Sequence, residues 1–95
     1  MKKLSELMLE GYAMVGRQCR GAYFRGDPIY PTSVCAAGAV FMAGTGRAYP
    51  PLKERKKFSR QFVRFADSVG SSIADLNDEG MSIPDIAGIA AAEGL

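Results

Sequence analysis

The sequence predicts an all-α protein, a compact bundle of three to five helices in a single domain over residues 1–95. Three observations predict this class. Apolar residues recur at spacings of three and four along most of the chain. An apolar run from Val34 to Gly44 is too short to span a bilayer and is typical of a buried helix. No segment alternates apolar and polar residues over more than a few positions, as a half-buried strand would.

The first predicted helix covers residues 5–19. Ser5 stands where an N-cap is expected, and Leu4 and Leu9 are spaced as a hydrophobic staple around it. Its apolar face comprises Leu4, Leu7, Met8, Tyr12, Val15 and Cys19. Residues 20–31 predict a loop, because Gly, Pro and aromatic residues are frequent there and Asp27-Pro28 favours a turn.

The second predicted helix covers residues 33–44, with Thr32 or Ser33 as its cap. It is apolar on every side, so we expect it at the centre of the bundle. Its small residues allow neighbouring backbones to come close. Gly44-Thr45-Gly46 ends this helix, and Pro50-Pro51 separates it from the next one.

Residues 52–79 predict a long helix with one regular apolar stripe. The stripe comprises Phe58, Phe62, Phe65, Val69, Ile73 and Leu76. An unbroken helix would be about 42 Å long, whereas a compact domain of this size is about 32 Å across. The helix therefore either breaks at Gly70-Ser71-Ser72 or protrudes to meet a partner. A last short helix follows over residues 83–92, with Ser82 as N-cap and Gly80 ending the helix before it.

Charge is unevenly distributed along the chain. Residues 1–46 carry five basic and three acidic side chains, residues 47–64 carry seven and one, and residues 65–95 carry none and six. Five of the cations fall on one face of the long helix: Lys53, Lys56, Lys57, Arg60 and Arg64. Such a face can bind phosphate backbones, although a merely solvated surface is the simpler interpretation.

The order of charges in the long helix also suggests self-association. Its cations stand in the first turns and Asp75, Asp78 and Glu79 in the last, opposite to what the helix dipole favours. Packing the acidic third of the chain against the basic face would compensate, either within the chain or in an antiparallel homodimer. The homodimer is a hypothesis, which the length of the helix also motivates.

Composition argues against the common catalytic and metal sites. The chain has no His, which removes Ser-His and Cys-His pairs and the commonest metal ligand. Cys19 and Cys35 are too few for a structural zinc site, and we expect free thiols packed in the core. A reactive Cys35, activated by the start of the central helix, is the alternative. No catalytic residue, metal or cofactor is predicted.

Glu6 and Glu10 interrupt the apolar stretch that an export signal would need. Together with two thiols that have no disulfide pattern, this predicts a cytoplasmic location.

Three segments carry a resemblance: GRQCRGAYF around Cys19, SVCAAGAVFMA around Cys35, and SIADLNDEGMSIPDIAGIAAAEG around Asn77-Asp78. Together they resemble a family of small uncharacterised bacterial and bacteriophage proteins, in which two cysteine-bearing segments precede an Asn-Asp segment. Gln18, Val34 and Leu76 stand where family members often carry aromatic residues. The resemblance implies a helical fold and no known activity, and it suggests that Cys19, Cys35, Asn77 and Asp78 converge at one end of the bundle. In the simpler interpretation of that grouping, Asn77 and Asp78 bond backbone groups at a helix end.

From these features we expect a small non-enzymatic binding protein, of bacterial or bacteriophage type, that uses the basic helix face. Its partner would be another protein or a second copy of the chain, and no membrane association is expected. The alternative is a nucleic-acid-associated protein that binds the phosphate backbone through the same five side chains.

Overall fold

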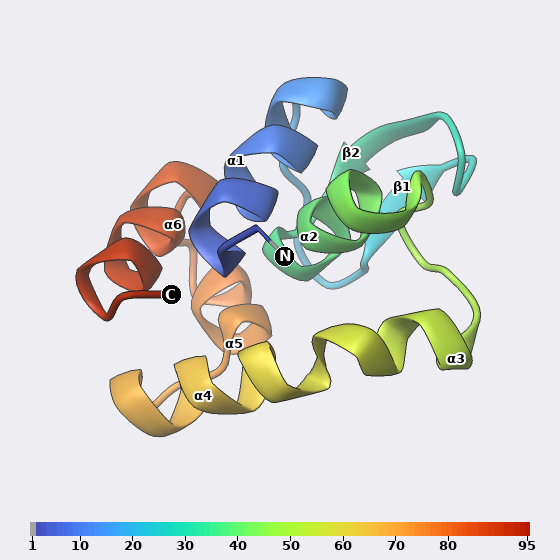
Figure 1. Cartoon of the computed structure of the whole chain (residues 1–95). Coiled ribbons are helices and arrows are strands. Elements are labelled where there is room, and N and C mark those ends of the chain that lie inside the picture. Colours follow the sequence, from blue (N-terminus) through green and yellow to red (C-terminus); the bar gives the residue numbers. More distant parts are fainter. Residues whose placement is uncertain (1) are drawn as a thin grey trace.

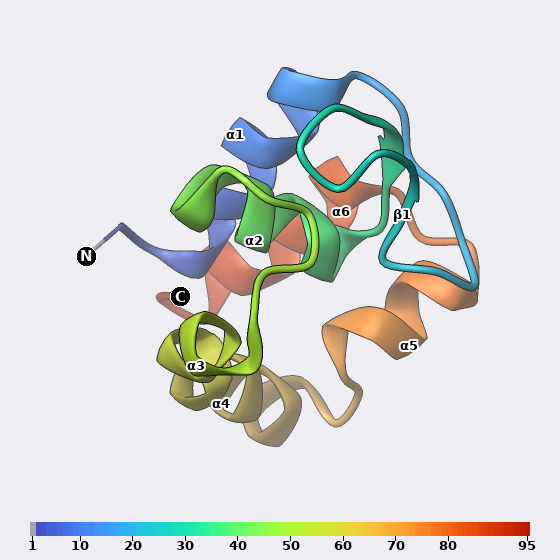
Figure 2. The ribbon, with the colours of Figure 1, turned by 90° about the vertical axis from the view of Figure 1, so that its right-hand side faces the viewer.

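The central apolar helix organises the molecule, as the sequence predicts. The computed structural model describes residues 2–95 (Figure 1). Its elements run in the order α1 (Leu4–Val15), β1 (Phe24–Gly26), β2 (Pro31–Val34), α2 (Ala36–Thr45), α3 (Leu52–Arg55), a 3-10 turn η1 (Lys56–Phe58), α4 (Ser59–Val69), α5 (Ile73–Asp78) and α6 (Ile83–Ala92). Figure 2 shows α2 near the middle of the molecule, with α1 above it and α3 and α4 below. The fold is therefore mostly helical, but it is not purely all-α.

The first helix is shorter than predicted. It begins at Leu4, so Ser5 lies inside it and is buried rather than serving as the N-cap. It ends at Val15, because Gly16 takes a left-handed conformation with φ 82° and donates its N–H to Tyr12 O. The predicted end at residue 19 is wrong. Cys19 consequently leaves the helix and lies in an extended segment.

The predicted loop over residues 20–31 contains part of a β-hairpin. β1 and β2 pair antiparallel, with Phe24 opposite Val34 and Arg25 opposite Ser33. The extended segment that follows α1 runs parallel to the other edge of β2, where Cys19 N donates to Val34 O (2.9 Å) and Val34 N to Arg17 O (3.0 Å). Three short extended segments thus lie side by side, with β2 in the middle.

The hairpin changes how the central helix begins. Thr32 and Ser33 belong to β2, so neither caps a helix. Cys35 is the N-cap of α2, and its Sγ accepts a hydrogen bond of 3.3 Å from Gly38 N. Residues 36–42 are all buried. Neighbouring backbones pack directly on this helix: a Cβ atom at Gly11 would collide with Ala39 O, and one at Gly38 with Tyr23 O.

The predicted long helix over residues 52–79 is divided into several pieces. It breaks at Gly70, which has φ 85°, and Ser72 caps α5 by accepting from Asp75 N (3.0 Å). The molecule measures 32 × 28 × 19 Å, so no helix within residues 2–95 protrudes from it. One of the two motives for a homodimer, an overlong helix, is thereby removed.

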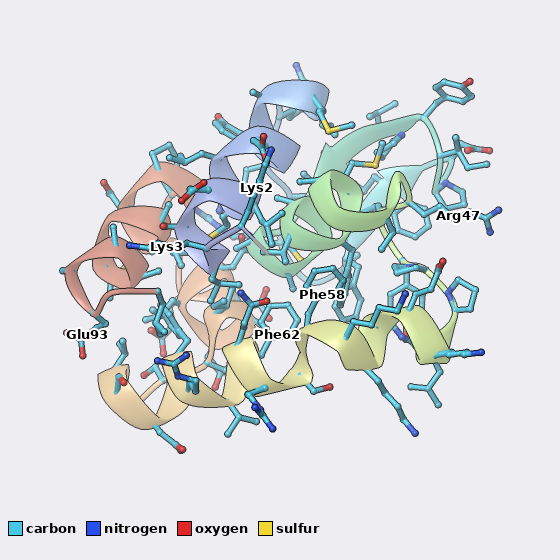
Figure 3. The ribbon with its side chains drawn as sticks, viewed as in Figure 1. Lys2, Lys3, Arg47, Phe58, Phe62 and Glu93 are labelled. Carbon is cyan, nitrogen blue, oxygen red and sulfur yellow. The ribbon has the colours of Figure 1, made fainter. Side chains whose placement is uncertain are left out.

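The apolar stripe of this region faces the core. Phe58, Phe65, Ile73 and Leu76 are buried. Figure 3 shows Phe58 and Phe62 reaching from η1 and α4 toward the interior of the molecule. There both rings pack edge-on against Phe41 of α2, at centroid distances of 5.8 and 5.6 Å.

The last helix forms where it is predicted. Ser82 caps α6 through a hydrogen bond from Asp85 N (3.2 Å), and Pro84 stands in the first turn. Gly80 takes φ 107° in the turn before it. Within residues 2–95, no helix has both the length and the apolar character needed to cross a bilayer.

Candidate functional site

The five predicted cations are all exposed, and we call them together the basic surface: Lys53, Lys56, Lys57, Arg60 and Arg64. They are distributed over α3, η1 and α4, which follow one another along one side of the molecule (Figure 1). In the part of the chain that the structure describes, the only side-chain ion pair within 4.0 Å joins Lys2 to Glu10. No acidic side chain of residues 2–95 therefore pairs with the basic surface.

The acidic residues that follow belong to a different helix. Asp75 lies in the first turn of α5, where the helix dipole favours a negative charge. Asp78 and Glu79 lie at the end of α5. In one continuous helix, cations would stand at the positive end of the helix dipole and these acidic residues at the negative end. That arrangement is absent between residues 52 and 79, because the helix is broken at Gly70.

Two exposed apolar side chains accompany the basic surface. Leu52 at the start of α3 is 56% exposed and Val63 in α4 is 57% exposed. They stand eleven positions apart, which corresponds to about 16 Å along a helix. Four cations of the basic surface lie between them in the sequence: Lys53, Lys56, Lys57 and Arg60. The surface thus offers both charge and apolar contact area.

The residues grouped by the resemblance also come together, around Asn77. Its side chain is completely buried. The Oδ1 atom accepts hydrogen bonds from Ala36 N (2.9 Å) and Gln18 Nε2 (2.7 Å), and Nδ2 donates to Cys19 O (2.9 Å). One amide therefore joins α5 to the start of α2 and to the extended segment after α1. Because these polar groups are hydrogen-bonded to one another in the interior, the contacts around Asn77 stabilise the fold.

Gln18 is the member of this cluster that the sequence analysis did not single out. Its Nε2 also donates to Met81 O (2.9 Å), and its Oε1 accepts from Ile83 N (2.8 Å). The side chain thereby fixes the beginning of α6. The available signal was a polar side chain at a position where the resemblance leads one to expect an aromatic ring.

A cavity of about 260 Å³ lies beside this cluster. Its lining comprises Gly21, Ala22, Tyr23, Cys35, Ala74 and Asp78. Asp78 itself is exposed and accepts a hydrogen bond from Gly21 N (3.1 Å). Burial raises the pKa of the Cys35 thiol, and the hydrogen bond from Gly38 N only partly opposes that effect. The start of α2 therefore does not produce the lowered pKa that a reactive Cys35 would need.

Among residues 2–95, no three Cys, Asp or Glu side chains gather in a way that could hold a metal ion. Cys19 and Cys35 are both free and buried.

Comparison with known proteins adds no relative. No family model, no curated protein and no solved structure matches the chain. The resemblance built on the segments around Cys19, Cys35 and Asn77-Asp78 therefore stays a prediction.

Proposed function

We propose that the chain is a non-enzymatic binding protein that holds an acidic protein partner on its basic surface. One combined observation carries the proposal. Five exposed cations have no acidic partner within residues 2–95, and two exposed apolar side chains lie in the same region. Cations already paired within the chain would have little to gain from a partner.

The apolar side chains favour a protein over a nucleic acid. Leu52 and Val63 can pack against apolar side chains of a partner, which a phosphate backbone does not offer. Protein interfaces commonly combine an apolar centre with charged side chains around it. Phosphate binding would use only the cations.

The position of these helices supports the same use. In Figure 1, α3 and α4 lie along one edge of the molecule, with the other elements on one side of them. Their phenylalanines fill the inner side and their cations occupy the outer side. A partner could therefore dock without displacing any part of the core.

The test compares two probes with two double variants of the full chain. The probes are a peptide with alternating glutamate and leucine, and a short DNA duplex, each followed by fluorescence anisotropy. Lys56→Glu with Arg60→Glu should weaken peptide binding about tenfold or more at low salt. Leu52→Ser with Val63→Ser should weaken peptide binding and leave DNA binding unchanged.

A matched control removes charge elsewhere. Lys3→Glu with Arg47→Glu makes the same charge change at two exposed cations outside the basic surface, and it should leave peptide binding nearly unchanged. Equal losses in both charge variants would refute a specific surface. Binding of DNA but not of the peptide would favour the nucleic-acid alternative, and a salt-dependent dimer mass in light scattering would identify a second copy as the partner.

A further inference from the structure

A second group of cations gathers away from the basic surface, on the hairpin and on the extended segment that precedes it. Arg17, Arg20 and Arg25 line an open cavity of about 490 Å³ together with Gln18, Cys19, Thr32 and Ser33. No acidic residue is part of that lining. In Figure 2 the hairpin lies toward the right of the molecule and α3 and α4 toward the lower left, so the two groups of cations belong to different parts of the fold.

The pairing of the extended segments explains why two of these arginines meet. Successive side chains on a strand point to opposite faces. Val34 is completely buried in the core, so its neighbour Ser33 points to the other face. Arg25 is the direct antiparallel partner of Ser33. On the other edge, Gln18 is the parallel partner of Val34, which places Arg17 in register with Ser33.

Ser33 stands between Arg25 and Arg17 in the register of the three extended segments, and it lines the same cavity. Ser33 is 3% exposed, and within residues 2–95 its hydroxyl makes no hydrogen bond. Its oxygen still contacts solvent, because within residues 2–95 the only fully buried side-chain N or O atom without a partner is Oε1 of Gln61. A solvent-accessible hydroxyl without a partner in the described part of the chain is free to donate to a ligand.

The arginines are also free to take an anion. No carboxylate lies within 4.0 Å of them in the described part of the chain. Arg20 donates to Gly80 O (3.1 Å) and Arg25 to Arg20 O (3.4 Å), which orients both side chains through neutral carbonyl groups and leaves their charges uncompensated. A guanidinium is a planar fork that binds two oxygens of one anion at once.

We propose that this cavity binds a tetrahedral divalent oxyanion, the phosphate group of a small phosphorylated ligand. Arg17 and Arg25 hold its oxygens from two sides, the Ser33 hydroxyl donates to it from the floor, and Arg20 adds a third positive charge. Three cations and a hydroxyl supply more positive charge and more hydrogen-bond donors than the two oxygens and single charge of a carboxylate can engage. The cavity is larger than a phosphate group and falls within the usual size of small-molecule sites, which leaves room for the rest of the ligand.

The test is a titration of the full ¹⁵N-labelled chain with inorganic phosphate near pH 7.5, at an ionic strength held constant with NaCl. We expect saturable shifts of amide signals in residues 17–25 and 31–34. Arg25→Gln should raise the dissociation constant about tenfold, the typical effect of losing a charge-assisted hydrogen bond. Arg47→Gln removes the same charge from an exposed arginine outside the cavity and should change it less than about twofold, because distant charges are screened.

A second variant keeps all charges. Ser33→Ala removes only the unpartnered hydroxyl, so it should weaken phosphate binding severalfold without lowering the unfolding midpoint. If Arg25→Gln does not fold, its amide signals lose their dispersion, and Ser33→Ala then tests the proposal in its place.

Two further anions separate charge from shape. Sulfate should bind at the same residues as phosphate, because both are tetrahedral dianions, and acetate should bind much more weakly. Shifts that do not saturate, equal effects of Arg25→Gln and Arg47→Gln, unchanged binding by Ser33→Ala, or acetate binding as tight as phosphate would each overturn the proposal.

Discussion

The side chain of Gln18 donates a hydrogen bond of 2.7 Å to Oδ1 of Asn77, across 59 positions of the sequence. Two buried or partly buried amides thus meet where α5, the start of α6 and the extended segment after α1 come together. Each amide also pairs with backbone groups outside the regular ladders, among them the first N–H groups of α2 and α6. Removing one partner of such a buried pair lowers stability, because the remaining polar group then has neither a protein partner nor water.

Replacing Asn77 should therefore be among the most destabilising single changes. Asn77→Ala leaves Ala36 N and Cys19 O without their partners in the interior. We expect the free energy of unfolding to fall by about 3 kcal/mol, the sum of roughly two unsatisfied buried groups. Urea denaturation followed by circular dichroism measures this. Glu79→Ala, an exposed change two residues away, should stay within about 0.5 kcal/mol, and a similar loss in both variants would contradict the assigned role.

Two helical glycines should respond to alanine in opposite directions. A Cβ atom at Gly11 would collide with the Ala39 carbonyl of α2, so Gly11→Ala has to push α1 away from the central helix. We expect a loss of about 2 kcal/mol or more. At Gly88 in α6 a Cβ atom meets nothing within 4 Å, and Gly88→Ala should stabilise by up to about 1 kcal/mol through helix propensity.

Thermal unfolding of the two glycine variants provides the measurement. The midpoint should fall for Gly11→Ala and rise for Gly88→Ala. A midpoint unchanged by Gly11→Ala would show that α1 and α2 can separate at little cost.

The helices could be predicted because their determinants are local. Spacings of three and four located the apolar faces, and the cap at Ser82 follows from a residue type that favours this position. The break at Gly70 was one of the two alternatives that the length of the predicted helix left open. The short strands could not be predicted in the same way. β1 and β2 have three and four residues, too few to show alternation, and they are held by pairing with each other and with the segment around Gln18. Because α1 ends early, at Gly16, that segment is extended and can pair with β2.

The two groups of cations illustrate the same difference. The basic surface follows from helical periodicity, so its five exposed side chains could be read from spacing. Arg17, Arg20 and Arg25 have no common period, and only the pairing of β2 with β1 and with the segment around Gln18 places two of them in register with Ser33. Before the strand register is known, these arginines are scattered charges. A site assembled by long-range pairing leaves no local pattern.

The Cys35 thiol makes the stability of the chain depend on pH in the alkaline range. Burial raises the pKa of this thiol above its ordinary value of 9.0. In the range just above that value the folded chain still holds the proton and the unfolded chain has lost it. Unfolding then releases a proton, so the contribution of Cys35 to stability is complete below about pH 9 and decreases as the pH rises through the higher pKa of the folded state.

The measurement compares urea midpoints at about pH 8 and pH 10 for the natural chain and for Cys35→Ala, which subtracts the titration of lysines and tyrosines. The midpoint should fall more for the natural chain than for the variant. Alkylation by iodoacetamide gives a second readout in a Cys19→Ala background, where only Cys35 reacts. Because the thiolate is the nucleophile, labelling of the folded protein at neutral pH should be much slower than that of the urea-unfolded protein. Fast labelling of the folded protein would mean that Cys35 is accessible and ionised, which neither its burial nor its raised pKa permits.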